Sequence, residues 1–306
     1  MTSIAFLFPG QGSQYVGMGK EFYENFSLAR RVFEEADDAL HFSISKLCFQ
    51  GPGEALKLTE NTQPAILTTS IASLRVLQEE KGFTPQFAAG HSLGEYSALV
   101  VSGALLFTDA VQIVRLRGRF MQEAVPVGEG AMAAVLGMEQ EEVVRLCEEA
   151  AGDEVLAPAN YNSPGQIVIS GHLKAVERAI EAVNQKGKRA MLLPVSAPFH
   201  SPLMKGAGER LEKELEKISI GDLKIPVVTN VEAEINTEKD RVKPLLVTQV
   251  SSPVLWEGSV KRMIQGGVER AIEIGPGKVL SGLMKRIDSK IGTGNIEDIQ
   301  TLKKIT

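Results

Sequence analysis

Gly90-His91-Ser92-Leu93-Gly94 sets a serine between two glycines, where the apolar run from Phe87 to Ala89 gives way to a helical pattern. The segment from Leu93 to Leu106 is nearly all apolar, which is typical of a helix buried behind a sheet. A sharp turn from strand to helix needs glycine on both sides, because a side chain there would collide with the two elements as they reverse past each other. We therefore predict a strand–turn–helix unit of an α/β fold that presents Ser92 as a nucleophile. A glycine-rich turn with a solvated serine is the alternative.

The composition is that of a globular protein with room for more than one minimal domain. The chain has 306 residues, of which 43% are hydrophobic and 23% charged, so one large domain with an insertion, or two domains, is expected. The formal net charge of -5 argues against nucleic acid as a partner, because nucleic-acid-binding proteins cluster cations. Small molecules or proteins are the expected partners.

We expect neither a secretory leader nor contact with a membrane. Met1 to Phe8 has no basic leader, and no apolar stretch approaches the roughly 20 residues that span a bilayer. A cytoplasmic protein is therefore expected. Its two cysteines, Cys48 and Cys147, lie far apart in helical segments, which predicts buried thiols rather than a disulfide, and no metal-ligand spacing occurs.

A first strand of a parallel sheet is predicted near the start of the chain. Ile4 to Phe8 is a short apolar run that leads into the turn Pro9-Gly10-Gln11-Gly12. The dinucleotide fingerprint does not fit, because Tyr15 stands where its third glycine should be. The backbone N–H groups of the Gln11 turn could instead serve an oxyanion. Further strands are expected at Pro226 to Asn230 and at Ala271 to Ile274.

Between Ala131 and Val195 the pattern changes to that of a separate α+β unit. The order is strand, helix, strand, strand, helix, strand, which is the split βαβ order of a ferredoxin-like unit. The expected elements are a strand at Ala131 to Leu136, a helix at Glu139 to Ala150, strands near Val155 to Tyr161 and Gln166 to Ile169, and a further helix and strand. We therefore predict a small domain at 129–196, inserted into a large domain made of 1–128 and 197–306. From Ile291 onward no motif can be interpreted.

A serine hydroxyl needs a base, most often histidine, and the chain has only four histidines. His41 and His172 are expected to be solvated, and His91 points away from the serine in a sharp turn and suits packing. His200 remains, in the proline-flanked segment Pro194 to Pro202, which predicts a rigid loop at the end of the inserted domain. We interpret His200 as the base, with a merely structural histidine as the alternative.

The acidic third member of a hydrolase triad is missing from this pattern. No aspartate stands in a convincing loop between Ser92 and His200. A thiol is a good leaving group and asks little of a strong general acid, so a neutral carbonyl would suffice to orient the imidazole. The pattern favours thioester chemistry over proteolysis.

Arg117 places a cation on an apolar helix face. At helical spacing Arg115 and Arg119 share one face, whereas Arg117 falls nearly opposite, among Ile113, Val114, Phe120 and Met121. A buried guanidinium must find an anion, and its planar fork fits a carboxylate. An internal salt bridge or a stem that reaches water is the simpler reading. With a nucleophile nearby, a substrate carboxylate becomes the better hypothesis.

Taken together, these motifs resemble the malonyl-CoA:acyl carrier protein transacylase family of bacterial fatty-acid synthesis, over essentially the whole chain. The matching segments, in family order, are Phe8 to Gln14, Asn61 to Ala65, Gly90 to Glu95, Arg117-Gly118, Asn160 with Ser163 to Gln166, Phe199-His200, and Gly275 to Gly277. The resemblance implies a hydrolase-like α/β large domain on a parallel sheet that carries the ferredoxin-like insertion. Phe199 before the histidine is similar to the pattern of malonyl-selective members.

The resemblance also implies roles for single residues. Ser92 would be acylated, with His200 as its base and the backbone carbonyl of Gln249 orienting the imidazole. Backbone N–H groups of Gln11 and Leu93 would form the oxyanion hole. The substrate-binding residues it implies are Arg117 for the malonyl carboxylate, with Gln63, Met121, Asn160 and Phe199.

The expected reaction is a ping-pong transfer from malonyl-CoA to the phosphopantetheine thiol of acyl carrier protein. Coenzyme A enters as a thioester substrate, and no permanently bound cofactor or metal is expected. The cation pairs Lys188-Arg189 and Lys285-Arg286 are candidate contacts for CoA phosphates or for the acidic carrier protein, with solvated cations as the simpler reading. A thioesterase, a discrete loading enzyme of a polyketide pathway and a non-catalytic scaffold are the alternatives.

Overall fold

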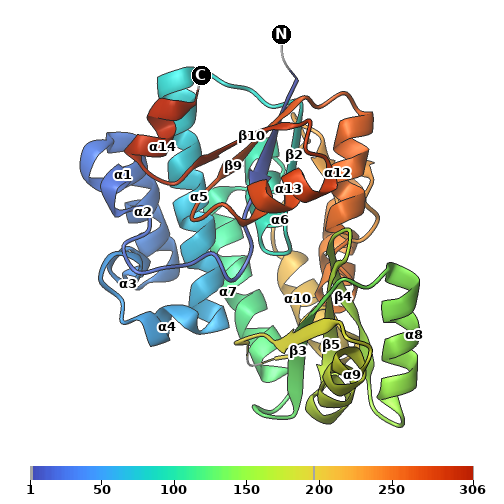
Figure 1. Cartoon of the computed structure of the whole chain (residues 1–306). Helices are drawn as coiled ribbons and strands as arrows, with labels where there is room; N and C mark the ends of the chain where they lie inside the picture. Colours follow the sequence, from blue (N-terminus) through green and yellow to red (C-terminus); the bar gives the residue numbers. More distant parts are fainter. Residues whose placement is uncertain (1–2, 196, 306) are drawn as a thin grey trace.

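A mostly parallel sheet lies at the centre of the larger part of the molecule (Figure 1). The structure, a computed structural model, describes residues 3–195 and 197–305, and within them the strand order of this sheet is β10-β9-β1-β2-β7-β8. All neighbouring strands run parallel except β7 and β8. The strands are β1 (Ile4–Phe8), β2 (Phe87–Gly90), β7 (Val227–Val228), β8 (Ile235–Asn236), β9 (Arg270–Ile274) and β10 (Gly292–Ile296).

The central strand β1 is buried on both faces, because its side chains alternate between two apolar cores. Ile4, Phe6 and Phe8 belong to one core, and Ala5 and Leu7 belong to the other. The first core is completed chiefly by α2 (Ser27–Leu40), α5 (Thr59–Lys81), α6 (Gly94–Ser102) and α7 (Phe107–Glu123), and the second by α12 (Trp256–Gln265) and α13 (Val279–Ile287). Helices thus cover both faces of the sheet, as an α/β fold requires.

The parallel pairing of β1 with β2 brings two predicted turns together. Phe8 pairs with Gly90, so both strands end at the same edge of the sheet. The backbone N–H of His91 donates to the carbonyl of Phe8 at 3.1 Å. The turn that contains Gln11 therefore lies beside the turn that contains Ser92, at the carboxyl edge where α/β folds place their sites.

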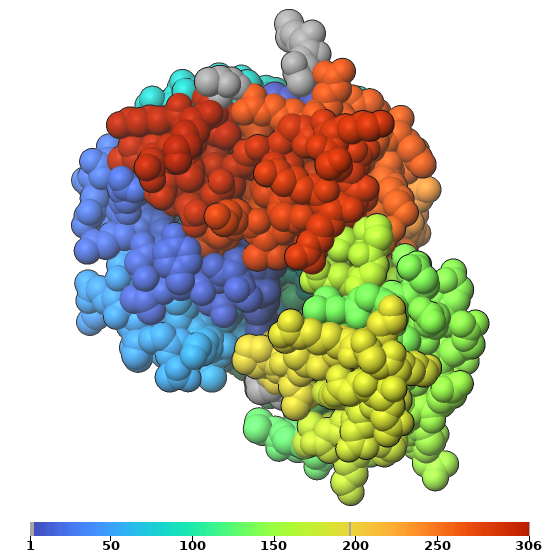
Figure 2. All heavy atoms as spheres, viewed as in Figure 1, coloured from blue at the N-terminus to red at the C-terminus, as the bar shows by residue number. Residues whose placement is uncertain are grey.

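A second sheet of four antiparallel strands forms its own lobe, in the order β4-β5-β3-β6 among the described residues. Its elements are β3 (Gly130–Leu136), α8 (Gln140–Ala151), β4 (Leu156–Ser163), β5 (Gln166–His172), α9 (Leu173–Gln185) and β6 (Arg189–Leu192), with a separate apolar core. This element order is the predicted ferredoxin-like order. In Figure 2 these green-to-yellow residues stand out from the rest of the molecule. The domain boundaries stay a prediction, and the junction after residue 196 falls on Ser196, outside the described residues.

The helix that follows Ser92 is shorter than the sequence suggested. It was expected to run to Leu106, but α6 ends at Ser102 because Gly103 adopts a left-handed conformation with φ of 84°. The strand expected at Pro226 to Asn230 is likewise shorter than expected, because only Val227–Val228 form β7. The burial of α6 is as predicted, with nearly all of its residues inside the protein.

The cysteines are free and buried in helices, as predicted: Cys48 in α3 (Ile44–Gln50) and Cys147 in α8. No helix in the part of the chain that the structure describes is long and apolar enough to cross a membrane. The other helices are α1 (Lys20–Asn25), α3 (Ile44–Gln50), α4 (Gly53–Lys57), α10 (Lys205–Leu215), α11 (Val242–Ser251) and α14 (Ile299–Lys304), with 3₁₀ turns at Pro202–Met204 and Lys239–Arg241.

Candidate active site

Ser92 occupies a strained turn between β2 and α6. Its backbone φ is 52°, in the left-handed region that non-glycine residues rarely adopt. A Cβ on Gly90 would lie 1.9 Å from the backbone of Gly94, and a Cβ on Gly94 would lie 2.0 Å from the carbonyl oxygen of Phe8. Both glycines are therefore required by backbone contact, as the sequence predicted.

His200 lies against the serine. Its Nε2 is 2.7 Å from Ser92 Oγ, and its Nδ1 is 2.9 Å from the backbone carbonyl oxygen of Gln249. Because that carbonyl can only accept, Nδ1 carries the proton and Nε2 is left to accept one from the serine. Burial, helped by the positive charge of Arg117, lowers the pKa of His200 to about 3. The imidazole is therefore neutral, the form a general base needs.

Arg117 points into the same site from α7. It is 1% exposed, and its Nη2 donates to Ser92 Oγ and to Gln249 Oε1, at 3.0 Å each. Its Nη1 donates to Gln63 Oε1 at 2.8 Å. Among the described residues it forms no ion pair with a carboxylate, and it does not reach solvent. Both simpler readings of this cation are thus excluded there.

Gln249, on α11, joins the three predicted groups. Its backbone carbonyl accepts from His200 and its side-chain Oε1 accepts from Arg117. Its Nε2 donates to Glu95 Oε2 at 2.8 Å and to the backbone oxygen of Ser92 at 3.1 Å. The sequence implied only the backbone role, so the side-chain contacts are an addition.

Sequence reasoning missed Asn230 and Glu95. Asn230 Oδ1 accepts from the backbone N–H of Ser92 at 2.6 Å, and its Nδ2 donates to the carbonyl of Gly90 at 2.7 Å. Its own backbone N–H donates to Glu95 Oε2 at 3.0 Å. An acidic residue in the otherwise apolar run after Ser92 was the available signal for Glu95. Nothing local marks Asn230, which lies beyond a two-residue strand.

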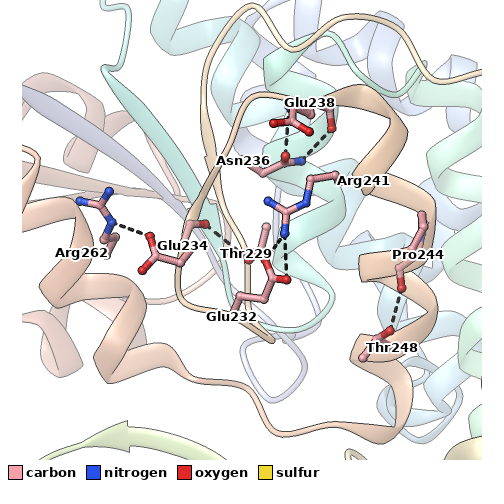
Figure 3. A network of polar contacts seen from close by, with 9 residues as sticks. All are labelled: Thr229, Glu232, Glu234, Asn236, Glu238, Arg241, Pro244, Thr248 and Arg262. Atoms are coloured by element: carbon pink, nitrogen blue, oxygen red, sulfur yellow. Dashed lines mark hydrogen bonds and ion pairs between the residues drawn. The ribbon is translucent and has the colours of Figure 1, made fainter.

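Asn230 is carried by the hairpin between β7 and β8, which surface ion pairs brace (Figure 3). Arg241 Nη2 donates to both carboxylate oxygens of Glu232, at 2.6 and 2.8 Å, and Arg262 donates to Glu234 at 2.8 Å. These contacts tie the hairpin to the residues before α11 and to α12. Two ion pairs thus connect the turn that carries Asn230 to other parts of the large lobe.

Two backbone N–H groups at the turns remain free to bind a ligand. Within the described residues no protein acceptor is found for the N–H of Gln11 or of Leu93. The side-chain Nε2 of Gln11 donates to Thr59 Oγ1 at 3.4 Å. Leu93 directly precedes α6, so the positive end of the helix dipole adds to its N–H. The pair can serve a developing negative charge.

The remaining predicted binding residues differ in how closely they adjoin the site. Gln63 Nε2 contacts Met121 Sδ at 3.9 Å, so both line the Arg117 side. Phe199 is 7% exposed and precedes His200. Asn160, on β4, pairs with Val254 and makes no hydrogen bond to Ser92, His200 or Arg117 within the described part of the chain. Its role stays a prediction.

The other singled-out cations and histidines lie outside this hydrogen-bonded set. Lys188 and Arg189 are exposed at the start of β6, and Arg286 donates to the side chain of Gln166. His91 is half-buried, with Nε2 2.8 Å from Asn162 Oδ1 and its ring packed on Trp256, which fits its expected packing role. His41 is exposed as expected, whereas His172 is half-buried and accepts from the backbone of Val155, so the solvated reading of His172 was wrong. No group of three or more potential metal-ligating side chains is found in residues 3–195 and 197–305.

Comparison with known proteins places this site in a family. The model of the acyl transferase domain matches residues 5–300. The malonyl CoA-acyl carrier protein transacylase of Bacillus subtilis (strain 168) is 53% identical over 305 residues, which cover 99% of this chain and 96% of the relative. The crystal structure of the transacylase of that name from Clostridium perfringens superposes with a TM-score of 0.96 at 48% identity, covering 99% of this chain and 96% of that one. A malonyl-transacylase in complex with its type II PKS acyl-carrier protein gives a TM-score of 0.96 at 44% identity, with 99% and 98% covered. This chain therefore belongs to the malonyl CoA-acyl carrier protein transacylase family of acyl transferases.

Proposed function

We propose that this protein transfers a malonyl group from malonyl-CoA to the phosphopantetheine thiol of an acyl carrier protein, through an ester on Ser92. One observation carries the proposal: the buried guanidinium of Arg117 lies 3.0 Å from Ser92 Oγ and has no carboxylate partner of its own among the described residues. A malonyl thioester carries a reactive carbonyl at one end and a free carboxylate at the other. The two groups of the substrate thus match the two groups of the site.

In the first half-reaction, His200 Nε2 takes the proton of Ser92 Oγ as the oxygen bonds to the thioester carbon. The negative charge on the carbonyl oxygen is held by the N–H groups of Gln11 and Leu93. The C–S bond then breaks, and the CoA sulfur leaves with the proton from His200. The products are malonyl-Ser92 and free CoA.

In the second half-reaction the carrier thiol attacks the ester. Its proton passes to His200 as sulfur bonds to carbon, and the C–O bond breaks to return the proton to Ser92. A bound malonyl carboxylate also offsets the charge of Arg117, which helps to lower the pKa of His200. Malonyl binding therefore makes the imidazole a stronger base in both steps.

The same transfer reaction can serve fatty-acid synthesis or a polyketide pathway, depending on which carrier protein accepts the malonyl group. The relative from Bacillus subtilis is a transacylase for acyl carrier protein, and another similar transacylase is bound to a type II PKS carrier. We propose a fatty-acid carrier as the acceptor, with a polyketide carrier as the alternative that carrier selectivity decides. Substrate contacts from Gln63, Met121, Asn160 and Phe199, CoA-phosphate contacts from Lys188 and Arg189, the absence of a permanently bound cofactor and a cytoplasmic location stay predictions.

Intact-mass spectrometry after incubation with malonyl-CoA tests the proposal. The parent protein should gain a malonyl adduct that maps to Ser92, and adding a carrier protein with its phosphopantetheine arm should remove it and malonylate the carrier. Ser92→Ala should gain no adduct. Release of free malonate in place of carrier transfer would identify a thioesterase, and full transfer activity in Ser92→Ala would overturn the proposal.

A further inference from the structure

Glu95 is a buried carboxyl that the two half-reactions do not use. It lies in the first turn of α6 and is 2% exposed. One of its oxygens, Oε2, accepts both the side-chain Nε2 of Gln249 at 2.8 Å and the backbone N–H of Asn230 at 3.0 Å. A single acceptor thus joins α11 to the loop after β7.

The contact with Glu95, together with the longer donation of Nε2 to the backbone oxygen of Ser92 at 3.1 Å, decides which way the Gln249 amide faces. With Nε2 towards Glu95, Oε1 is directed to Arg117 and accepts from its Nη2 at 3.0 Å. A rotation of the amide by half a turn would set an oxygen against the Glu95 oxygen and an N–H against the guanidinium. Either mismatch leaves a buried polar group without a partner, which costs about 1–3 kcal/mol. The two contacts therefore select the same orientation.

The guanidinium depends on this orientation because its other acceptors are few. Among the described residues its hydrogen bonds go to Gln63, Gln249 and Ser92, and its Nε has no hydrogen-bond partner there. Without Gln249 Oε1, Nη2 would keep only the serine hydroxyl, which the reaction consumes. Gln63 would still accept from Nη1 and the Tyr96 ring would still lie 5.6 Å from the guanidinium carbon, but the Nη2 end of the fork would lose its only acceptor that the reaction does not use.

We infer that Glu95 is a positioning residue: it holds the Gln249 side-chain amide with Oε1 facing Arg117 and so keeps the guanidinium aimed for a substrate carboxylate. This rests on the proposed function, since it concerns selection of malonyl over uncharged acyl groups. It requires the acceptor oxygen of Glu95 rather than its charge, because a neutral side chain of the same shape can receive both N–H groups.

Transfer rates for malonyl-CoA and acetyl-CoA in four proteins test this inference. Glu95→Leu fills the volume without an acceptor, Glu95→Gln keeps one, and Gln249→Met removes the amide but keeps the backbone carbonyl that holds His200. We expect Glu95→Leu to lower the malonyl-to-acetyl ratio of kcat/KM about tenfold, the effect of losing one hydrogen bond to a charged group. Glu95→Gln should keep the ratio within about threefold of the parent.

The double variant separates positioning from general support of the fold. In the Gln249→Met background, Glu95→Leu should leave the ratio unchanged within about twofold, because the amide through which it acts is gone. An unchanged ratio in Glu95→Leu, a loss in Glu95→Gln as large as in Glu95→Leu, or additive losses in the double variant overturn the inference. If Glu95→Leu does not fold, Gln249→Met tests the inference by itself. An unchanged malonyl-to-acetyl ratio of kcat/KM in Gln249→Met also overturns the inference. If the parent protein forms no malonyl ester, the proposed function itself is wrong.

Discussion

Arg117 and Ser92 are joined directly, because Nη2 of the guanidinium donates to the serine Oγ at 3.0 Å. The two residues lie 25 positions apart on α7 and on the turn before α6. An ordinary nucleophilic serine needs a base and an oxyanion hole, and a permanent cation beside it is an extra feature. The arrangement fits an acyl group that carries its own negative charge at the far end.

Replacing this cation should change substrate choice more than chemistry. We expect Arg117→Ala to lower kcat/KM for malonyl-CoA by about 2–3 kcal/mol, or roughly 30- to 150-fold, because a charge-assisted contact to the carboxylate is lost. Transfer from acetyl-CoA should fall far less. Arg119→Ala is the matched control, since Arg119 is an exposed cation on the same helix. Equal losses of kcat/KM for malonyl-CoA and acetyl-CoA would show that Arg117 does not bind the malonyl carboxylate.

The serine turn should tolerate no side chain at its second glycine. Gly94→Ala sets a Cβ 2.0 Å from a backbone oxygen of Phe8, and backbone cannot move aside cheaply, so we expect a loss of stability of about 3 kcal/mol or more. Gly206→Ala, in α10, meets nothing within 4 Å and should stabilise the fold by up to about 1 kcal/mol. Urea unfolding of both variants measures the contrast. Equal stabilities would show that the turn can relax.

Local periodicity was enough to predict most of the fold. β1 spans the residues that its apolar run marked, and the small sheet has the predicted element order. β10 was missed because Gly292-Thr293-Gly294-Asn295 carries almost no apolar signal, and pairing with β9 alone makes it a strand. The early end of α6 at Gly103 was missed because the residues after it stay apolar while they leave the helix.

The residues of the candidate site also fall into those that a local sequence pattern predicts and those that depend on long-range contacts. Ser92, His200 and Arg117 each carry a local signal: paired glycines, flanking prolines and a cation on an apolar face. Asn230 has none, because its contact with the serine spans 138 positions and depends on how β7 pairs beside β2. The Gln249 side chain likewise acquires its role only when the fold brings its amide within reach of Glu95 on α6 and Arg117 on α7. The residues proposed to contact the substrate were thus easier to predict than the residues that position them.

His200 should work as a base well below the pH at which an ordinary histidine stops. Its pKa is lowered to about 3, because burial and the charge of Arg117 oppose the imidazolium. The group is therefore unprotonated above that value, and kcat/KM for acylation should show no acid limb near pH 6.5, the ordinary histidine range. Stopped-flow release of CoA from pH 8 to pH 5 measures this. An acid limb near pH 6.5 in the parent protein would contradict it.

Glu95 should make stability fall as the pH rises through neutrality. Burial raises its folded pKa to about 7 from an unfolded value near 4.5, although hydrogen bonds from Gln249 and Asn230 oppose the shift. The folded state therefore holds a proton that the unfolded state has lost, so the stabilisation is complete below about pH 4.5 and is lost above about pH 7. Glu95→Gln cannot ionise. We expect it to gain about 2 kcal/mol relative to the parent between pH 5 and pH 8.5.

Glu273 provides the matched control for that measurement. Its pKa is also raised to about 7 by burial, but its carboxylate accepts from the backbone N–H groups of Leu280 and Ser281 at the start of α13. Glu273→Gln should reproduce the pH trend in urea unfolding and leave the malonyl-to-acetyl ratio at the parent value. If the stability difference between Glu95→Gln and the parent does not vary with pH, Glu95 has the same pKa folded and unfolded. The groups that lower its pKa would then just balance its burial, and the carboxylate would be charged beside the Gln249 amide from pH 5 upward.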